Sequence, residues 1–442
     1  MPTTATTMLS AADLRDPTSA AYKKARKRHL KTTRNRDEQL EADWTPFRAA
    51  EKKYKARFPP PDLSDVLDLA LLDESRAEET KRGGWWGKPD ALQCKEIRMN
   101  HAEGKTAYVF PSTPGLVLLP SFVSPEEQRH LVRWALSDHA RPPNETNLDT
   151  HYILPEEGLW NKYVNVRRHV CEDEYIQPRA SLTTATDSMS TAIPEPPGPR
   201  KLISNEPASK DNYTAISAAP KPPLAPSPSV HPLTTSALIQ KLRWANIGWS
   251  YHWGSKQYDF SKGKAEIHDS VKRVCKRAVD AVNWFEVFGD GVPDCGDWGE
   301  DGPDWESWNE TYEPDAGIVN FYQVKDTLMA HVDRSEVCAT SPLVSISLGC
   351  AAVFLIGGLT RDVEPTPILL RSGDVVIMSG PACRRAYHGV PRILEDTLPP
   401  HLEASAADED WELYAEYLHT TRVNVNVRQV FPVLPVDTLK VR

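Results

Sequence analysis

The stretch Arg422-Val-Asn-Val-Asn-Val-Arg428 alternates strictly between polar and apolar residues. This period of two predicts a β-strand, with the arginines and asparagines on one face and the three valines on the other. A strand whose polar face lies in water would use Lys, Glu and Thr as readily as Arg and Asn. Two arginines about 20 Å apart, at ~3.3 Å per residue, can instead bracket a small dianion through bidentate contacts. Taken alone, the segment leaves both interpretations open.

Short apolar runs precede this strand from residue 316 onward, and Gly, Pro and Asp separate them at intervals of about ten residues. We predict strands at Gly317–Tyr322, Leu343–Leu348, Ala352–Leu355, Ile368–Leu370, Val375–Met378 and Val423–Val430. Many short strands at such regular spacing are typical of a β-sandwich or a jelly-roll barrel.

Two histidines and one aspartate in this region suggest a metal site. In a strand, His331-Val-Asp333 would place both polar side chains on one face, and His388 follows later in the chain. Two imidazoles and one carboxylate suit non-haem Fe(II) and leave coordination positions open. An isolated His-x-Asp occurs by chance in many proteins, so it identifies nothing alone. The strand with two arginines strengthens the case, because a 2-oxo acid that chelates iron needs a fixed cation for its distal carboxylate.

The composition excludes several classes of protein. Of the 442 residues, 40% are hydrophobic and 26% are charged, which is typical of a globular chain and excludes a wholly disordered protein, a collagen or a coiled coil. No apolar run reaches the ~18 residues of a membrane-spanning helix. The seven cysteines include no Cys-x-x-Cys pair, which argues against a disulfide framework and against a cysteine-based zinc site. The net charge of −9 means that a nucleic-acid partner would need a local basic patch.

Changes in composition divide the chain. We predict a basic disordered tail (1–40), a helical N-terminal extension (41–110), the first part of the main domain (111–175), a disordered Pro/Ser-rich insertion (176–235) and the rest of the main domain (236–435). Ser124-Pro-Glu-Glu127 predicts a helix start, and the helix should run to about Leu136. An acidic loop spans 289–315, and its tryptophans either pack against the domain or dock a partner.

Together, the ordered motifs resemble the AlkB family of Fe(II)- and 2-oxoglutarate-dependent dioxygenases, and in particular its homologue-one branch. The resemblance rests on Asn320-Phe-Tyr322, His331-Val-Asp333-Arg-Ser-Glu336, His388, Arg422-x-Asn424-x-x-x-Arg428, Leu242–Trp244, Gly248–Trp253, Ile356–Asp362, Ser372–Gly380 and Arg428–Phe431. The insertions at 176–235 and 289–315 lie outside it. The resemblance implies a mainly β fold with helices (α+β): a double-stranded β-helix core, jelly-roll or cupin-like, with a helical N-terminal extension.

The resemblance also implies a role for each matching residue. The implied iron ligands are His331, Asp333 and His388. The implied contacts of the co-substrate 2-oxoglutarate are Asn320, Tyr322, Arg422, Asn424 and Arg428. Among these, Arg422 corresponds to the residue that pairs with the distal carboxylate, and Arg428 to the one near the iron-chelating end.

An aromatic segment and several cations are candidates for substrate contacts. In Gly248–Gly254, the rings of Trp249, Tyr251 and Trp253 are expected to form a lid that stacks a base, although each ring would serve equally well in the barrel core. The cations are Lys256, Lys262, Lys264, Lys272, Arg273, Lys276 and Arg277. They either meet phosphates or lie on solvated faces.

For function, the resemblance implies oxidative demethylation of N-methylated bases in nucleic acid, with release of formaldehyde, succinate and CO2. The substrate is tRNA, DNA or both, presented as a single strand or a flipped base. A protein (histone) demethylase or hydroxylase and an abasic-site lyase are alternatives. The basic run Lys23–Arg28 is a nuclear signal, a nucleic-acid-binding arm or a solvated helix. We expect a monomer without a membrane partner, in the nucleus or cytoplasm, and a mitochondrial location stays open.

Overall fold

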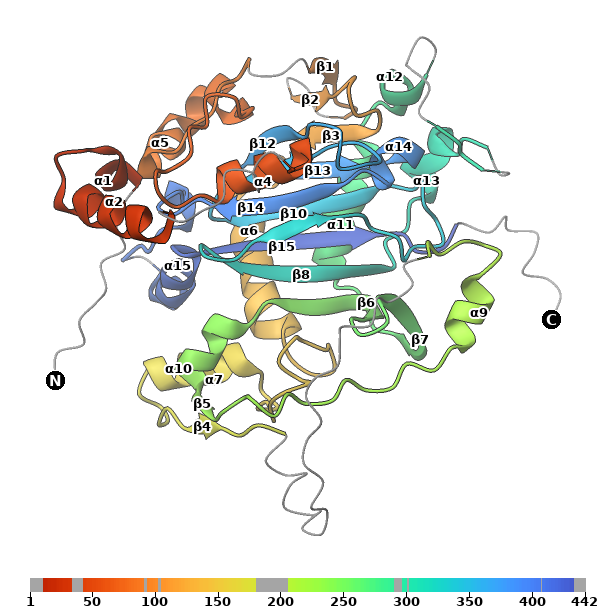
Figure 1. The fold of residues 1–442 in the computed structure, drawn as a ribbon. Helices are drawn as coiled ribbons and strands as arrows, with labels where there is room; N and C mark the ends of the chain where they lie inside the picture. Colours follow the sequence, from red (N-terminus) through yellow and green to blue (C-terminus); the bar gives the residue numbers. More distant parts are fainter. Residues whose placement is uncertain are drawn as a thin grey trace.

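The structure is a computed structural model of the 442-residue chain. It describes residues 11–33, 43–90, 94–101, 105–179, 206–289, 296–299, 302–406 and 408–432. Figure 1 shows a layered β-structure at the centre of the molecule, with helices packed around it. Within the described ranges, no helix has both the length and the apolar character needed to cross a bilayer.

Eight strands form two facing antiparallel sheets. They are β8 (Ala316–Gln323), β9 (Leu328–His331), β10 (Leu343–Gly349), β11 (Ala352–Ile356), β12 (Thr366–Leu370), β13 (Val375–Met378), β14 (His388–Ile393) and β15 (Thr421–Arg428). One sheet has the order β13-β10-β15-β8 and the other β12-β11-β14-β9. The chain therefore changes sheet at every step except the β11–β12 hairpin. This is the topology of a double-stranded β-helix, and the predicted fold class is confirmed.

The larger sheet extends past the barrel at both edges. Beyond β13 it continues with β3 (Leu116–Leu119), β2 (Thr106–Val109) and β1 (Lys95–Arg98), and beyond β8 with β6 (Trp244–His252) and β7 (Gln257–Lys264). A separate pair consists of β4 (Tyr175–Ile176) and β5 (Leu233–Thr234). Strands β1 and β2 lie in the region 41–110 that the sequence predicts as helical. In β1 only Ile97 is buried, so its short polar pattern is that of a one-sided strand at the edge of a sheet.

Helices cover the outer face of the large sheet. The main ones are α6 (Pro125–Arg133), α7 (Leu159–Arg167), α10 (Thr235–Leu238), α11 (Asp269–Asp280), α12 (Trp284–Phe288), α13 (Trp308–Thr311) and α15 (Glu412–Leu418). The short helix α14 (Gly380–Arg384) instead places Cys383 in a second core cluster with residues of β3, β10 and β13. The predicted helix after Ser124 is confirmed: α6 begins with a Ser124–Glu127 capping box and continues into a π-helical turn over Trp134–His139. The valines of β15, all fully buried, pack on this side in the main core.

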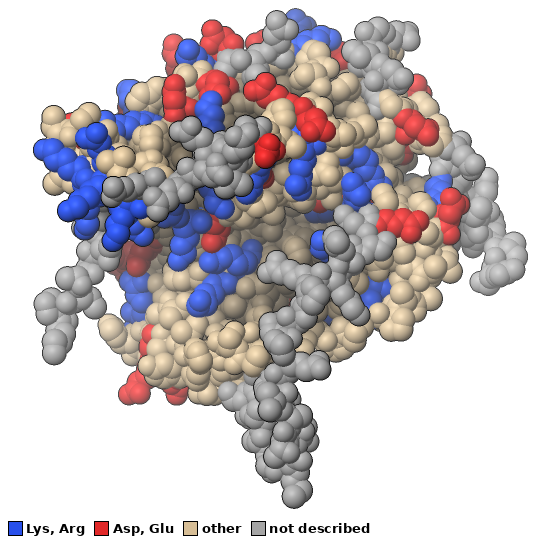
Figure 2. Space-filling view, viewed as in Figure 1, with Lys and Arg blue, Asp and Glu red and all other residues tan. Residues whose placement is uncertain are grey.

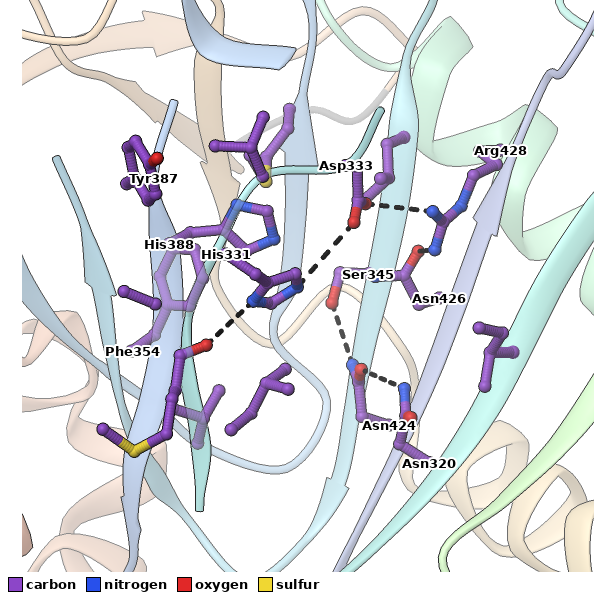
Figure 3. A pocket seen from close by; sticks show the side chains of 18 of the residues that line it. Asn320, His331, Asp333, Ser345, Phe354, Tyr387, His388, Asn424, Asn426 and Arg428 are labelled. Atoms are coloured by element: carbon purple, nitrogen blue, oxygen red, sulfur yellow. Dashed lines mark hydrogen bonds and ion pairs between the residues drawn. The ribbon is translucent and has the colours of Figure 1, made fainter. Parts of the chain in front are cut away.

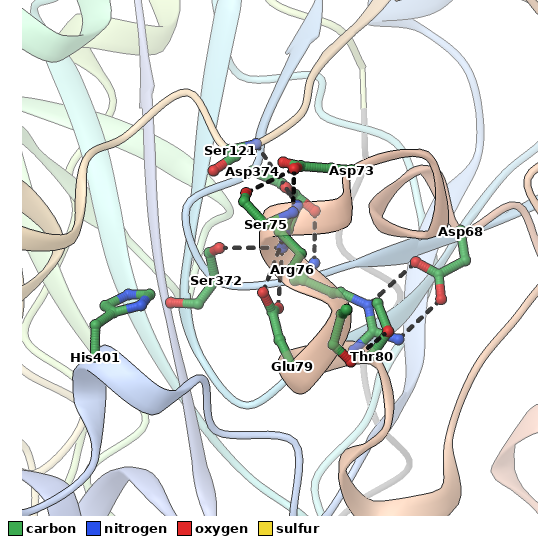
Figure 4. Close-up of polar contacts among 12 residues, drawn as sticks. Asp68, Asp73, Ser75, Arg76, Glu79, Thr80, Ser121, Ser372, Asp374 and His401 are labelled. Carbon is green, nitrogen blue, oxygen red and sulfur yellow. Dashed lines mark hydrogen bonds and ion pairs between the residues drawn. The ribbon is translucent and has the colours of Figure 1, made fainter.

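The N-terminal extension is attached to the barrel by buried ion pairs. It contains α4 (Pro46–Lys55), α5 (Ala77–Thr80) and the 3-10 turns Leu69–Leu72, Glu74–Arg76 and Arg82–Gly84. Arg76 forms ion pairs with Glu79 and, at 2.8 Å, with Asp374 in the turn between β12 and β13 (Figure 4). Asp68 pairs with the fully buried Arg371 at 2.8 Å. Removing one partner of such a buried pair costs about 3–5 kcal/mol. The extension is therefore part of the folded domain.

Two segments differ in part from the predictions made from the sequence, and a third agrees with one of two alternatives. Residues 11–33, expected as a disordered tail, form α1 (Ala11–Arg15) and α2 (Ala20–Thr33). In the expected disordered insertion, residues 180–205 lie outside the described residues, and the remainder holds α9 (Tyr213–Ala218) and β5. In the acidic loop, Trp308 is buried edge-on against Trp284. The residues of this loop that the structure describes therefore pack against the domain, which is one of the two interpretations that the sequence leaves open.

Candidate active site

The predicted metal ligands come together between the two sheets. His331, the last residue of β9, pairs in register with His388, the first residue of β14, and their ring centroids are 4.3 Å apart. One ligand atom from each of His331, Asp333 and His388 lies within 4.8 Å of the others. The prediction that Asp333 lies in the same strand as His331 is wrong, because β9 ends at His331. Asp333 lies just beyond the strand, and its Oδ1 comes to 3.7 Å from His331 Nε2 (Figure 3).

Backbone contacts orient both imidazoles for metal binding. His331 Nδ1 lies 3.0 Å from the Met329 carbonyl oxygen, and His388 Nδ1 lies 3.1 Å from that of Ala386. A carbonyl can only accept, so each Nδ1 carries the proton and each Nε2 keeps a lone pair for a metal. Burial, and then the neighbouring His331, lowers the pKa of His388 to about 4. His388 is therefore a neutral ligand at neutral pH, and the residues present fit a metal of the Fe(II) type.

Arg428 fixes the third ligand. Its Nη1 donates to Asp333 Oδ2 at 2.9 Å and to Glu336 Oε1 at 2.8 Å, and its Nη2 donates to Asn426 at 2.9 Å. Burial alone would raise the pKa of Asp333, but Arg428 and then His388 hold it well below its usual range. Because Oδ2 is held by Arg428, Oδ1 is the oxygen that faces His331. The guanidinium thus lies at the metal end of the cavity, with most of its donors already used.

Arg422 differs from Arg428 in having no anionic partner. Its side chain is 2% exposed, and Nη2 donates to Ser347 Oγ at 2.8 Å. Its Nε has no hydrogen-bond partner, and among the residues described here no carboxylate pairs with it. Burial lowers the pKa of Arg422 to about 10, so the group is still charged at neutral pH. A buried, charged guanidinium without an anionic partner favours binding of an anion, and the distal carboxylate of 2-oxoglutarate would be such an anion.

Cross-strand neighbours complete this end of the cavity. In the pairing of β15 with β8, Arg422 lies opposite Tyr322 and Asn424 lies opposite Asn320. Asn424 Nδ2 donates to Ser345 Oγ at 2.8 Å, and the two asparagine side chains are 3.4 Å apart. Burial raises the pKa of Tyr322 to about 12, so its hydroxyl keeps its proton. Every predicted co-substrate contact, together with Asn426, lines the same cavity of about 530 Å³, within the ~300–1,000 Å³ of small-molecule sites.

The aromatic segment divides between the cavity and the core. Tyr251 and Trp253 line the cavity, as does Lys256 in the β6–β7 turn. Trp249 does not; it contacts Phe260 and Phe431 in an aromatic cluster against which Tyr251 also packs. The pairing of β6 with β7 is irregular at this point, with a register shift between Trp249 and Ser250.

Most of the other candidate cations lie away from this cavity. Lys262 pairs with Glu145 at 2.9 Å, and Arg277 pairs with Glu127 at 2.6 Å. Lys276 pairs with Glu313. The helix that carries Lys276 and Arg277, α11, packs in the core on the outer side of β10. Of the four cations expected as a basic stripe on α11, Lys276 and Arg277 are thus paired, and none of the four lines the cavity.

The N-terminal extension also supports the metal site. Strand β9 lies at the edge of its sheet, so its outward backbone groups lack a neighbouring strand. Glu51 of α4, only 3% exposed, accepts from the Ala330 N–H at 2.6 Å, and Arg361 donates to the Ala330 carbonyl at 3.1 Å. Side chains therefore clamp the residue that precedes His331 on both sides. Arg48 balances the Glu51 charge with a contact of 3.0 Å.

We expect Glu51→Ala to weaken metal binding, because the unsatisfied Ala330 N–H would loosen the end of β9 that carries His331. Loss of a residue that orients a ligand typically costs about 10–100-fold in metal affinity. Titration with Mn(II), followed by calorimetry, measures the effect without turnover. Glu51→Gln keeps an acceptor oxygen and should bind Mn(II) much more tightly than Glu51→Ala. Equal Mn(II) affinity in wild type and Glu51→Ala would contradict the clamp.

Comparisons with known proteins agree with this geometry. The model of the 2OG-Fe(II) oxygenase superfamily matches residues 215–428. The N6-methyladenosine RNA demethylase ALKBH of Cryphonectria parasitica is 30% identical, over 53% of this chain and 96% of its own length. The chain belongs to the AlkB family. Within the family, the DNA N(6)-methyladenine demethylase ALKBH1A of Arabidopsis thaliana is 28% identical over 88% of this chain and 97% of its own length. The tRNA demethylase abh1 of Schizosaccharomyces pombe is 29% identical, over 87% and 96%.

These relatives place the AlkB-family chain in the homologue-one branch, as the motifs indicate. It is a 2-oxoglutarate-dependent oxidoreductase whose cofactor is Fe(II). Two features of the structure fit these groups: the converging donor atoms of His331, Asp333 and His388, and the unpaired buried guanidinium of Arg422. These residues would hold the metal and the distal carboxylate, respectively.

Several residues that support this AlkB-family site could not be predicted from the sequence. Glu51, Glu336, Ser347 and Arg361 act on the site through contacts with residues far away in the chain, so no local spacing points to them. Glu336 carries a weak signal, because it is part of the His331–Glu336 motif. A buried carboxylate three residues after a metal ligand needs a cation, and the arginine strand supplies it.

Proposed function

We propose that this protein removes N-methyl groups from bases of nucleic acid by oxidation. The observation that carries the proposal is the mixture of rings and cations on the outer part of the cavity. Tyr251, Trp253 and Tyr387 are rings that can stack a base, and Lys256 and Arg361 are cations that can meet its phosphates. Arg361 also lies over the Tyr387 ring at 5.1 Å, which gives one face of the cavity both properties.

The relatives support the same substrate class. Their names assign N6-methyladenine in DNA to the Arabidopsis protein, tRNA to the fission-yeast protein and N6-methyladenosine in RNA to the Cryphonectria protein. All three are demethylases of nucleic acid, although the polymer differs. We infer the class from this agreement and leave the polymer to experiment. A nuclear or cytoplasmic location and a monomeric state stay predictions.

The chemistry requires little of the protein beyond placement. When bound, Fe(II) and 2-oxoglutarate would supply, together with O2, the oxidation of a methyl C–H bond: one oxygen atom enters that bond, and the other enters succinate as CO2 leaves. The C–N bond of the resulting N-hydroxymethyl group then breaks. Formaldehyde leaves, and the hydroxyl proton is transferred to the base nitrogen. Within the chain, Arg422 and Asn424 orient the co-substrate, and Tyr251 and Trp253 hold the base so that its methyl group faces His331 and Asp333. A base reaches this depth only from a single strand, a loop or a flipped position.

Parallel assays with several nucleic acids test the proposal. Purified protein with Fe(II), ascorbate and 2-oxoglutarate is incubated with total tRNA, and with methyladenine-bearing single- and double-stranded DNA, and nucleosides are measured by mass spectrometry. We expect loss of a methylated nucleoside from at least one polymer, and none with His331→Ala. Loss from tRNA alone, or from DNA alone, assigns the polymer. Succinate formed in the presence of a histone peptide, with every nucleoside unchanged, would overturn the proposal in favour of a protein substrate.

A further inference from the structure

The charged residues of helix α2 are all cations. Its 14 residues include no acidic side chain. The six basic residues, all exposed, are Lys23, Lys24, Arg26, Lys27, Arg28 and Lys31. Among the residues that the structure describes, none of the six forms an ion pair. The less exposed residues of the helix include Tyr22, Ala25 and His29. They are three and four residues apart, so they share one helix face, which is turned to the protein.

Aromatic contacts fix this helix on the domain. Tyr22 meets Phe58 edge-on with ring centroids 5.1 Å apart, and His29 meets the same ring at 5.7 Å. The preceding helix is held as well, since Arg15 donates to the carbonyl oxygens of Gly84 and Pro61. The guanidinium of Arg15 also lies 4.7 Å from the Trp85 ring centroid. The cationic face of α2 therefore has a defined position relative to the barrel.

The extension that holds α2 also contacts the segment that lines the active-site cavity. Phe58 comes shortly after α4, whose last residue Lys55 donates to Thr327 Oγ1 at 3.3 Å. Thr327 immediately precedes β9, and Leu328 and Met329 of β9 line the cavity. Figure 2 shows Lys and Arg side chains gathered over α1 and α2 and continuing toward a hollow near the centre of this face. The basic surface and the cavity thus belong to one side of the molecule.

We propose that α2 binds the phosphate backbone of the nucleic-acid strand whose target base occupies the cavity. The inference rests on the proposed function and extends it to a second contact surface. The whole chain carries a net charge of −9, so it would repel a polyanion unless a local patch attracts one. A helix of 14 residues is about 21 Å long at ~1.5 Å per residue. In a duplex each strand carries one phosphate per ~3.4 Å of helix axis, so this length faces about six phosphates of one strand.

A triple glutamine variant tests the proposal. Lys24→Gln, Lys27→Gln and Arg28→Gln remove three charges from α2 and keep helix-forming side chains. The matched control is Lys272→Gln, Arg273→Gln and Lys276→Gln on α11, which removes the same charge from a helix on the outer side of β10. Binding to a single-stranded 30-nucleotide DNA and to tRNA is followed by fluorescence anisotropy over a range of salt concentrations. Circular dichroism confirms that each variant keeps its helices.

We expect the α2 variant to bind both polymers at least tenfold more weakly at low salt, whereas the α11 control binds like wild type. Each phosphate contact on a single strand contributes about 0.7 to the slope of log K against log salt. Loss of three contacts should therefore reduce that slope by about 2. Demethylation of a methylated trinucleotide, too short to span both surfaces, should be unchanged in the α2 variant, while demethylation of the long substrate falls.

The outcomes separate this inference from the proposed function. Equal weakening in the two triple variants would mean that only net charge matters, and it would overturn the inference. Unchanged binding together with loss of nuclear accumulation in cells would make α2 a transport signal and would also overturn it. If wild type demethylates neither trinucleotide nor long strand, the proposed function fails. The anisotropy difference between α2 and α11 variants still decides whether α2 binds phosphates.

Discussion

Asp333→Ala protein is expected to form no measurable succinate and to bind Mn(II) at least 100-fold more weakly than wild type. The substitution removes one of three metal donors, and an open site with two imidazoles has neither the charge nor the geometry for this metal. The fold should survive, because the side chain contributes a ligand rather than core volume. Arg428 keeps a buried anionic partner, since Glu336 Oε1 still accepts from it at 2.8 Å. The variant thus separates metal binding from folding.

Three measurements check this expectation: succinate release, Mn(II) titration and thermal unfolding without metal. The control is Asp269→Ala in the exposed first turn of α11, which removes the same charge far from the ligands and should leave all three near wild type. Succinate formed by Asp333→Ala at the wild-type rate would show that the ligand assignment is wrong. A collapse of the melting temperature would instead show that Asp333 is needed to compensate Arg428.

How far the fold follows from sequence depends on how local its determinants are. The Arg422–Arg428 strand was predictable because alternation alone sets its two faces, and its valines are indeed buried and its polar residues line the cavity. Strands β9 and β14 have no such pattern. The first is only four residues long, and the second contains Pro391. Their pairing is also irregular, with a register shift between His388 and Val390. Tertiary contacts define these strands, and propensity does not.

The site shows the same division. The residue types of the His-x-Asp motif, His388 and the arginine strand carry their own chemistry, so spacing was enough to nominate them. Trp249 lies outside the cavity that Tyr251 and Trp253 line, beside an irregular stretch of the β6–β7 pairing, and periodicity does not anticipate that difference. Glu51 supports the metal site across 279 residues of sequence separation. Its partner is a backbone N–H, a group that every residue except proline carries, so nothing in the local sequence identifies it.

The basic N-terminal segment illustrates a third case. Its composition leaves open a disordered tail, a nuclear signal, a nucleic-acid-binding arm or a solvated helix, because the charges dominate the sequence. The deciding contacts, from Tyr22 and His29 to Phe58, are made by two weakly apolar residues at helical spacing. Such contacts form only when Phe58 is already held by the extension. The helix is therefore a consequence of the folded domain more than of its own sequence, as is usual for short helices.

The second large effect is expected at Arg422. In Arg422→Met protein, we expect the dissociation constant for 2-oxoglutarate to rise at least about 30-fold, because removing one partner of a buried charge pair costs about 2–5 kcal/mol and ~1.4 kcal/mol is a factor of ten. Arg422→Lys keeps the charge but loses the planar fork, so its loss should be smaller. The measurement is calorimetric titration of the Mn(II)-loaded protein with 2-oxoglutarate. An unchanged affinity in Arg422→Met would overturn the assignment.

Replacing Arg422 should weaken co-substrate binding without lowering the stability of the ligand-free protein. Burial lowers the pKa of Arg422 to about 10, which means that the charged form is less favourable in the folded protein than in the unfolded chain. Without 2-oxoglutarate, the charge at neutral pH therefore costs stability, and Arg422→Met should melt at a temperature equal to or above that of wild type. Added 2-oxoglutarate should raise the melting temperature of wild type, since a ligand stabilises the state that binds it, and leave Arg422→Met unchanged. A variant that melts lower than wild type without ligand would mean that Arg422 is a structural cation, with Ser347 as its essential partner.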